Sequence, residues 1–141
     1  DACRRRGARQ SFGHSVTGIG RRHGAVRLEL AVDGRTDQAS FDAVMAIPAD
    51  DEFWDLAIAD PGPFGLFLAP VYDRGAATLH ALRLEVGDEA FYAAAQEWLV
   101  RFDDSTGTTE DFETVYEEVS GQDLGTFFDV WVRTPTKPTS W

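Results

Sequence analysis

Apolar residues recur at helical spacing along most of the chain from residue 37 onward. Positions three and four apart fall on one face of an α-helix, so this spacing predicts amphipathic helices. The clearest case is "DEAFYAAAQEWLVRF" (88–102), which carries one apolar stripe that would face a core. That stripe consists of Phe91, Ala95, Trp98, Leu99 and Phe102.

The next two predicted helices also have recognisable ends. "TTEDFETVYEEVSG" (108–121) begins with Thr108 or Thr109 as the N-cap, has acids in its first turn, and stops at Gly121. "DLGTFFDVWV" (123–132) is followed by prolines, which cannot continue a helix. The apolar faces of this pair are formed by Phe112, Val115, Tyr116 and Val119, and by Leu124, Phe127, Phe128 and Trp131.

The region before residue 88 predicts shorter elements. Segments 37–46 and 50–59 have the pattern of two short helices, and "DPGPFG" (60–65) has the composition of a turn. A longer helix is predicted from about Val71 to Val86, with Leu79, Leu82 and Leu84 on its apolar side and Gly87 as its stop.

The predicted fold is therefore all-α, an array of about five helices joined by short connections. We expect one core shared by these helices. Its predicted members are Phe91, Trp98, Leu99, Phe112, Val115, Phe127 and Trp131.

Residues 1–35 have a different character. They contain six glycines and no sustained period beyond a short alternation at 26–32, the one candidate strand. Eight arginines against three acids give this segment a charge of +5, whereas the whole chain carries −11, so residues 36–141 carry −16. Like charges and little apolar area predict poor order for 1–35, and we divide the chain into 1–35 and 36–141.

Charge and composition also limit the partners. The acidic body should repel nucleic acid, and the basic segment lacks the aromatic residues on which bases stack. One cysteine, Cys3, excludes an internal disulfide. No apolar run approaches the length that spans a bilayer, and no signal peptide is visible, so we expect a soluble and cytoplasmic rather than secreted protein.

Few residues stand out as chemical candidates. Cys3, His14 and His23 match no standard metal-ligand spacing, and "GHSVTG" lacks the spacing of a nucleophilic serine. His80, beside leucines in a predicted helix, is expected to be a packed or partly exposed histidine.

Tyr72 is the strongest candidate, because it lies in the first turn of a predicted helix after a proline-rich turn. Clefts are commonly built at such element ends, and a phenol there can donate a hydrogen bond to a developing oxyanion. Composition alone favours the alternative, a tyrosine that packs its ring and hydrates its hydroxyl.

The segment "VYDRGAATLHALRLEVGDEAFYAAAQEWLVRF" (71–102) resembles the part of the aminopeptidase N (membrane alanyl aminopeptidase) family that follows the zinc site. In this family of gluzincin zinc metallopeptidases the pattern is a tyrosine, two mostly charged residues, a glycine and a leucine-rich helix. The likeness covers roughly residues 33–141, ending with "FFDVWVRTPTKP". It implies the C-terminal helical subdomain of the catalytic domain, a zinc cofactor, and hydrolysis of N-terminal residues from peptides.

The resemblance assigns a role to Tyr72, since the matching tyrosine hydrogen-bonds the tetrahedral intermediate opposite the zinc. It also implies that the charged pair Asp73 and Arg74, with Gly75, begins a helix whose first residue faces the catalytic cleft.

The zinc motif itself is missing. Residues 5–17, "RRGARQSFGHSVT", are similar to the family's "HExxHQWFGNSVT", but Arg5, Arg6 and Arg9 occupy the positions of the first histidine, the general base and the second histidine. Arginine stays protonated and cannot ligate zinc. The third ligand position falls at Leu28. We therefore expect zinc to be absent and the chain to be inactive alone.

The origin of residues 1–35 stays open. Residues 28–33, "LELAVD", can be encoded so that a shifted reading frame gives a tryptophan-rich peptide similar to the family's. A frameshift, a truncation and a true pseudoenzyme are all compatible with this segment. Two functions follow: a fragment or degenerate member of a zinc metalloaminopeptidase, with the missing N-terminal domains as a partner, or a non-catalytic helical module that binds peptides or proteins.

Overall fold

The computed structural model describes residues 37–140, and every regular element in that range is helical. The expected all-α array is therefore confirmed for the described part of the chain. The candidate strand at 26–32 and the expected poor order of 1–35 lie outside it. The elements are α1 (Asp37–Met45), η1 (Glu52–Trp54), α2 (Gly62–Gly65), α3 (Ala69–Val86), α4 (Asp88–Arg101), α5 (Thr109–Ser120), α6 (Gly125–Phe128) and η2 (Asp129–Arg133).

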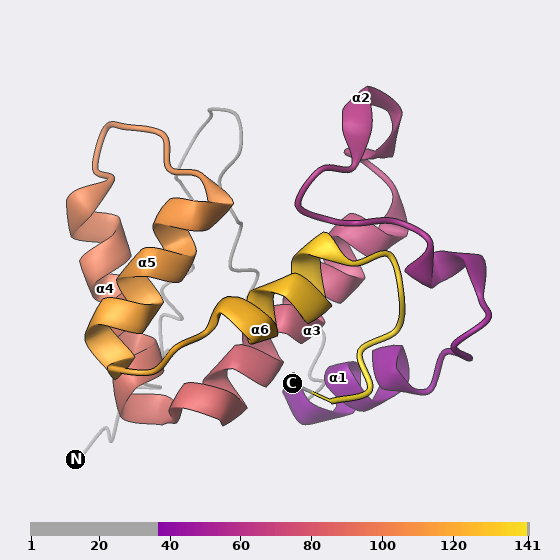
Figure 1. The fold of residues 1–141 in the computed structure, drawn as a ribbon, viewed down its shortest axis with the longest axis horizontal. Coiled ribbons are helices and arrows are strands. Elements are labelled where there is room, and N and C mark those ends of the chain that lie inside the picture. Colours follow the sequence, from indigo (N-terminus) through magenta and orange to yellow (C-terminus); the bar gives the residue numbers. More distant parts are fainter. Residues whose placement is uncertain (1–36, 141) are drawn as a thin grey trace, which may run out of the picture.

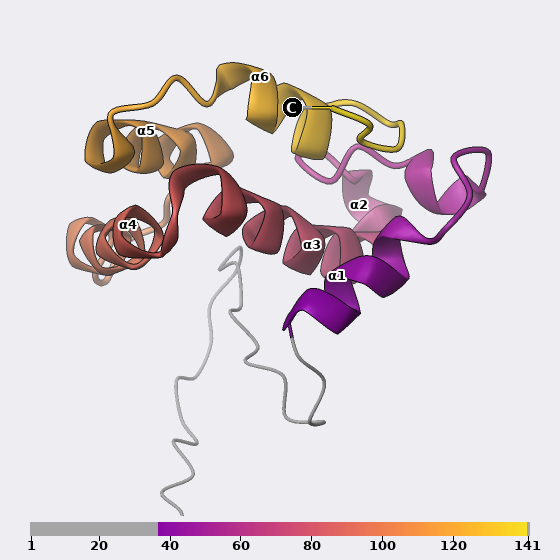
Figure 2. The same ribbon diagram turned by 90° about the horizontal axis from the view of Figure 1, so that it is seen from below.

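Helix α3 is the central element of the array (Figure 1). Helix α1, the 3-10 turn η1 and the π-helical turn η2 all contact it, while α4 and α5 pack against each other beyond its C-terminal end. Seen at right angles, α5 and α6 form a layer over α4 and α3 (Figure 2). The chain turns between α3 and α4 at Gly87, where φ is +82°, a conformation that favours glycine.

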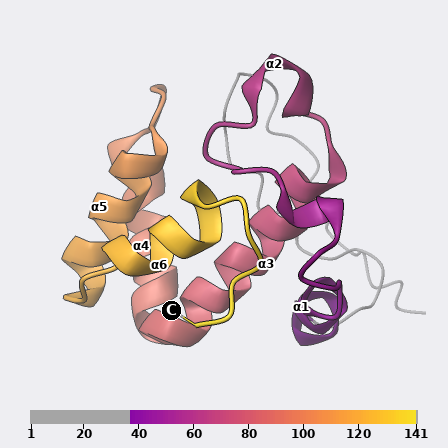
Figure 3. The ribbon, with the colours of Figure 1, turned by 45° about the vertical axis from the view of Figure 1, so that its right-hand side comes forward.

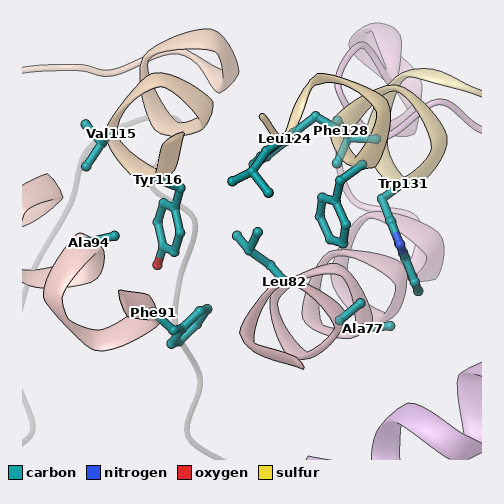
Figure 4. Packing of buried hydrophobic residues seen from close by; sticks show 12 residues of the cluster. Ala77, Leu82, Phe91, Ala94, Val115, Tyr116, Leu124, Phe128 and Trp131 are labelled. Carbon is teal, nitrogen blue, oxygen red and sulfur yellow. The ribbon is translucent and has the colours of Figure 1, made fainter. Parts of the chain in front are cut away.

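The core lies between these two layers. Leu82 of α3 is fully buried and lies between Tyr116 of α5 and Phe128 of α6 (Figure 4). Four of the predicted core residues are buried, and two more pack against them while partly exposed. The buried four are Phe91, Val115, Phe127 and Trp131, and the other two are Trp98 and Phe112.

Two apolar positions were predicted wrongly. Leu99 is 69% exposed and Leu84 is 60% exposed. Trp98 packs inward against Phe102 at a ring distance of 4.2 Å, and the next residue of a helix is turned by about 100°, so Leu99 points outward. Leu84 follows the buried Leu82 by two residues, which places it on the opposite side of α3.

The ends of α5 agree with the sequence. The Thr108 hydroxyl accepts a hydrogen bond from the Asp111 amide at 3.1 Å, and the Asp111 carboxylate accepts one from the Thr108 amide at 2.9 Å. This reciprocal capping satisfies two amides that the first turn leaves unpaired. Gly121 ends the helix with φ +71°.

The predicted helix at 50–59 is wrong, because only the short turn η1 forms there. Asp51 starts the turn by accepting a hydrogen bond from the Phe53 amide at 2.9 Å. The Trp54 and Leu56 carbonyls then accept from the Arg74 side chain instead of from later amides of the same segment. A tertiary contact therefore outcompetes the local helical pattern.

Smaller differences occur on either side of residue 66. The predicted turn at 60–65 contains one helical turn, α2, and α3 begins at Ala69 rather than at about Val71. The chain after η2 returns to α1, where Lys137 Nζ donates to the carbonyls of Met45 at 2.7 Å and Ile47 at 2.8 Å. A cation at these last carbonyls stabilises the C-terminal end of α1.

Candidate functional site

Tyr72 is the fourth residue of α3, in the first turn of that helix as the sequence predicted. Pro70 lies within the same turn, where its missing N–H costs nothing because the first amides of a helix have no intrahelical acceptor. The Tyr72 side chain is 57% exposed, and it has no hydrogen-bond partner among residues 37–140. Its hydroxyl is therefore free, within the described part, to meet another molecule or segment.

Four exposed apolar side chains lie in the segment directly before α3, the helix that carries Tyr72. Helix α2 and the turn after it extend away from the rest of the array (Figure 3). Phe64 is 94% exposed and Phe67 is 82% exposed, while Leu66 and Leu68 are each 51% exposed. We call these four residues the apolar turn surface. Contiguous exposed apolar groups of this kind commonly mark a contact site.

Arg74 lies two residues after Tyr72 and has the opposite environment, because it is fully buried. Its guanidinium lies 5.4 Å from the centre of the Trp54 ring and donates hydrogen bonds to five backbone carbonyls. Nε donates to Trp131 at 2.9 Å, Nη1 to Leu56 at 3.1 Å and Trp54 at 3.4 Å, and Nη2 to Thr134 at 2.7 Å and Val130 at 3.2 Å.

These carbonyls lie within or just after η1 and η2, and the partial negative charge of each oxygen favours a cation. No carboxylate pairs with Arg74 within residues 37–140. Burial lowers the pKa of the Arg74 guanidinium to about 10, so it remains charged at neutral pH. The carbonyl cage therefore takes the place of an ion pair.

The sequence analysis placed Arg74 in the charged pair near the start of this helix and did not predict its burial, and the structure shows that its side chain points into the protein. A signal for this placement was present in the pattern. Counting three, four, seven and eight residues onward from Arg74 gives four buried positions of α3. Those positions are Ala77, Thr78, Ala81 and Leu82.

The other candidates do not extend this site. His80 is partly buried, with Nε2 at 3.1 Å from the Gln38 side-chain oxygen and its ring 5.0 Å from that of Phe41, in agreement with a packed, partly exposed histidine. Cys3, His14 and His23 lie outside the described residues. Between residues 37 and 140 no group of three or more metal-binding side chains is close enough to hold an ion.

The zinc-motif positions Arg5, Arg6, Arg9 and Leu28 also lie outside the described residues. Their chemistry alone decides whether they fit the metal. Three guanidinium groups and one alkyl group offer no lone pair to a divalent cation. The donor set in these positions does not fit zinc.

The described residues form a helical unit with Tyr72 in the first turn of α3, and comparison with known proteins gives the family of the chain. Residues 58–131 match the peptidase family M1 domain, so the chain belongs to peptidase family M1. This range contains α2 to α6, Tyr72 and Arg74. The resemblance found in the sequence is thereby confirmed.

Two similar proteins are aminopeptidases. The chain is 31% identical over 70 residues to aminopeptidase N of Lactococcus lactis subsp. lactis, and 32% identical over 68 residues to aminopeptidase M1-C of Oryza sativa subsp. japonica. The alignments cover 50% and 48% of this chain but only 8% of either relative. No solved structure matches. None of the helices between residues 37 and 140 has the length and apolar character needed to cross a membrane.

Proposed function

We propose that this chain is a fragment or degenerate member of a zinc metalloaminopeptidase, in which Tyr72 is the oxyanion donor and which does not hydrolyse peptides alone. The observation that carries the proposal is the exposed phenol of Tyr72 on a turn held by the buried Arg74. A tyrosine needed only for packing would bury most of its ring, whereas Tyr72 is 57% exposed.

The chemistry assigned to Tyr72 is hydrogen-bond donation. When water adds to a peptide carbonyl, the oxygen gains negative charge, and a fixed O–H donor stabilises that charge more than it stabilises the ground state. A phenol at a helix start is well suited to this role because the helix fixes its Cα and Cβ while the ring reaches outward.

Hydrolysis also needs an activated water, which zinc supplies in the family. Arg5, Arg6 and Arg9 do not fit that metal, so these three positions do not supply the family's means of activating the water. We infer that the chain retains the hydrogen-bond donor for the oxyanion, Tyr72, and lacks the zinc ligands that would activate the water.

Gly75 and the apolar turn surface support a missing neighbour in the first part of α3 and the segment directly before it. Glycine inside a helix costs about 1 kcal/mol relative to alanine. A Cβ at Gly75 would meet nothing within 4 Å in the described part of the chain, so packing there does not demand a glycine. Close approach by another segment of a catalytic domain would explain it, with the missing N-terminal domains of the parent protein as the source.

The exposed aromatic side chains Phe64 and Phe67 favour a second function, a non-catalytic module that binds a peptide or protein. Its recognition would be apolar, at the same end of α3, and would need neither zinc nor the Tyr72 hydroxyl.

Zinc content and hydrolysis separate these functions. We expect the purified full chain to contain no zinc by elemental analysis and to release no chromophore from an alanyl p-nitroanilide. Zinc bound in stoichiometric amount, with hydrolysis, would overturn the inactive assignment. Peptide binding that survives Tyr72→Phe but is lost on Phe67→Ser would support the binding module instead.

Restoring the ligands tests the role of Tyr72. A variant with Arg5→His, Arg6→Glu, Arg9→His and Leu28→Glu carries the donor types that zinc prefers. Once zinc uptake is confirmed, adding Tyr72→Phe should lower kcat by roughly two to three orders of magnitude, as loss of an oxyanion donor does. Equal activity with and without the hydroxyl would contradict the assignment.

A further inference from the structure

Tyr72 and Arg74 are rotated by about 200° relative to each other around α3, since each residue of an α-helix turns by about 100°. When one of the two points into the protein, the other must point out. The structure shows this arrangement, with Arg74 fully buried and Tyr72 57% exposed. The direction of the phenol is thus tied to whatever holds the guanidinium.

The bonds of Arg74 resist rotation of α3. They reach two separate segments, because Nη1 binds carbonyls of residues 54 and 56 while Nε and Nη2 bind carbonyls of residues 130, 131 and 134. Rotation of α3 about its axis would lengthen the hydrogen bonds to one segment while it moved the guanidinium toward the other, so both sets of bonds oppose rotation. One turn further along, the Thr78 hydroxyl donates to the Arg74 carbonyl at 2.8 Å.

We infer that Arg74 is a positioning residue, which sets the rotation of the first turns of α3 and thereby the outward direction of the Tyr72 hydroxyl. The catalytic meaning of this inference rests on the proposed function. Its geometric content concerns only this chain. The sequence order Tyr-Asp-Arg-Gly then has a physical reason: the third residue anchors the turn that presents the first.

Lysine is the informative replacement. It keeps the positive charge, but its single ammonium has three donors on one atom and cannot span two segments as a planar fork does. Arg83→Lys is the matched control, because Arg83 lies on the same helix, is partly exposed, and donates to the Asp88 carboxylate at 2.7 Å. Its guanidinium lies 5.3 Å from the Tyr92 ring.

The experiment follows the three tyrosine rings by NMR, with ring-13C tyrosine and a soluble gadolinium chelate that broadens exposed groups. In the wild type, Tyr72 and Tyr92 should be strongly affected and Tyr116 protected, because their exposures are 57%, 49% and 0%. In Arg74→Lys, the broadening of the Tyr72 ring signal by the gadolinium chelate should fall by at least about half, or the signal should split into several, because the helix samples other rotations. Tyr116 should stay protected, which shows that the core is intact.

Arg83→Lys should affect Tyr92 and leave Tyr72 unchanged. A folded Arg74→Lys with the Tyr72 signal of the wild type would overturn the inference. Should Arg74→Lys unfold, about 1 M trimethylamine N-oxide favours its compact state. Trp54→Leu provides a second variant, since it removes the ring beside the guanidinium and keeps every donor.

In Trp54→Leu, faster exchange of the Arg74 Nε–H should be accompanied by a change at Tyr72. Faster exchange without that change would equally overturn the inference. Neither readout uses zinc or hydrolysis. A failure here therefore concerns Arg74, whereas an active restored variant that tolerates Tyr72→Phe would mean failure of the proposed function.

Discussion

Tyr72 and Arg74 lie in the same turn of α3, yet the tyrosine is 57% exposed and the arginine is fully enclosed by backbone carbonyls and the Trp54 ring. The two neighbouring residues therefore have different roles. Arg74 joins α3 to η1 and η2, and Tyr72 remains available at the surface.

Replacing Arg74 by leucine should be strongly destabilising. The change leaves carbonyls of two segments without their donor, and we expect a loss of about 3 kcal/mol or more in the free energy of unfolding. Urea denaturation followed by circular dichroism measures it. Arg83→Leu, at a partly exposed position of the same helix, should cost much less, and equal losses would contradict the special role of Arg74.

The corrected core predicts a second contrast within α3. Leu82 is fully buried, so Leu82→Ala should cost about 2–5 kcal/mol. Leu84 is 60% exposed, and Leu84→Ala should stay within about 0.5 kcal/mol of the wild type. Thermal unfolding of the two variants measures both losses. A larger loss of stability in Leu84→Ala than in Leu82→Ala would mean that the rotation of α3 is not as described.

Two glycines should respond to alanine with opposite signs. At Gly107 an added Cβ would lie 2.1 Å from the Trp98 ring, so Gly107→Ala should cost about 1–3 kcal/mol through overpacking. At Gly75 nothing lies within 4 Å in the described region, and Gly75→Ala should stabilise this chain by about 0.5–1 kcal/mol. A loss of stability in Gly75→Ala, measured by urea denaturation, would show a close neighbour already present.

Local sequence signals account for much of this fold. The cap at Thr108, the stop at Gly121 and the apolar stripe of α5 are properties of neighbouring residues, and all three are found in the structure. The position of Tyr72 in a first helical turn was predictable for the same reason, since a proline-rich turn precedes it. Family membership followed from the same segment.

Contacts between distant segments account for what the sequence did not predict. The helix expected at 50–59 is replaced by carbonyl contacts to Arg74, whose partners lie 18 and 20 residues away. From the sequence alone, an arginine within an apolar stripe is expected at the surface. Burial of an arginine needs hydrogen-bond partners, and for Arg74 only the folded chain brings these together. The predicted burial of Leu99 was wrong because the predicted apolar stripe was wider than the face of α4 that packs against the core.

Tyr116 gives the protein a specific alkaline response. Burial raises the pKa of its hydroxyl to about 12, against about 10 in an unfolded chain. The unfolded state therefore loses this proton first, so the stabilising contribution is present below pH 10 and is lost as pH rises toward 12. The lowered pKa of Arg74 acts in the opposite sense above about pH 10, so a variant is needed to isolate the tyrosine.

Tyr116→Phe is that variant. Relative to the wild type, its free energy of unfolding should increase by about 1 kcal/mol between about pH 8 and about pH 11. Urea denaturation at the two pH values measures the difference. A difference that is independent of pH would mean that the Tyr116 hydroxyl is not buried as described.

The central claim is that the Tyr72 hydroxyl serves contact with another molecule or segment and not the stability of this helical body. Tyr72→Phe removes that one donor and keeps the ring, so its stability in urea tests the claim most directly. We expect the free energy of unfolding to stay within about 0.5 kcal/mol of the wild type, as for an exposed hydroxyl. A loss greater than about 1.5 kcal/mol, as for a buried hydrogen bond, would make Tyr72 a structural residue and contradict the account.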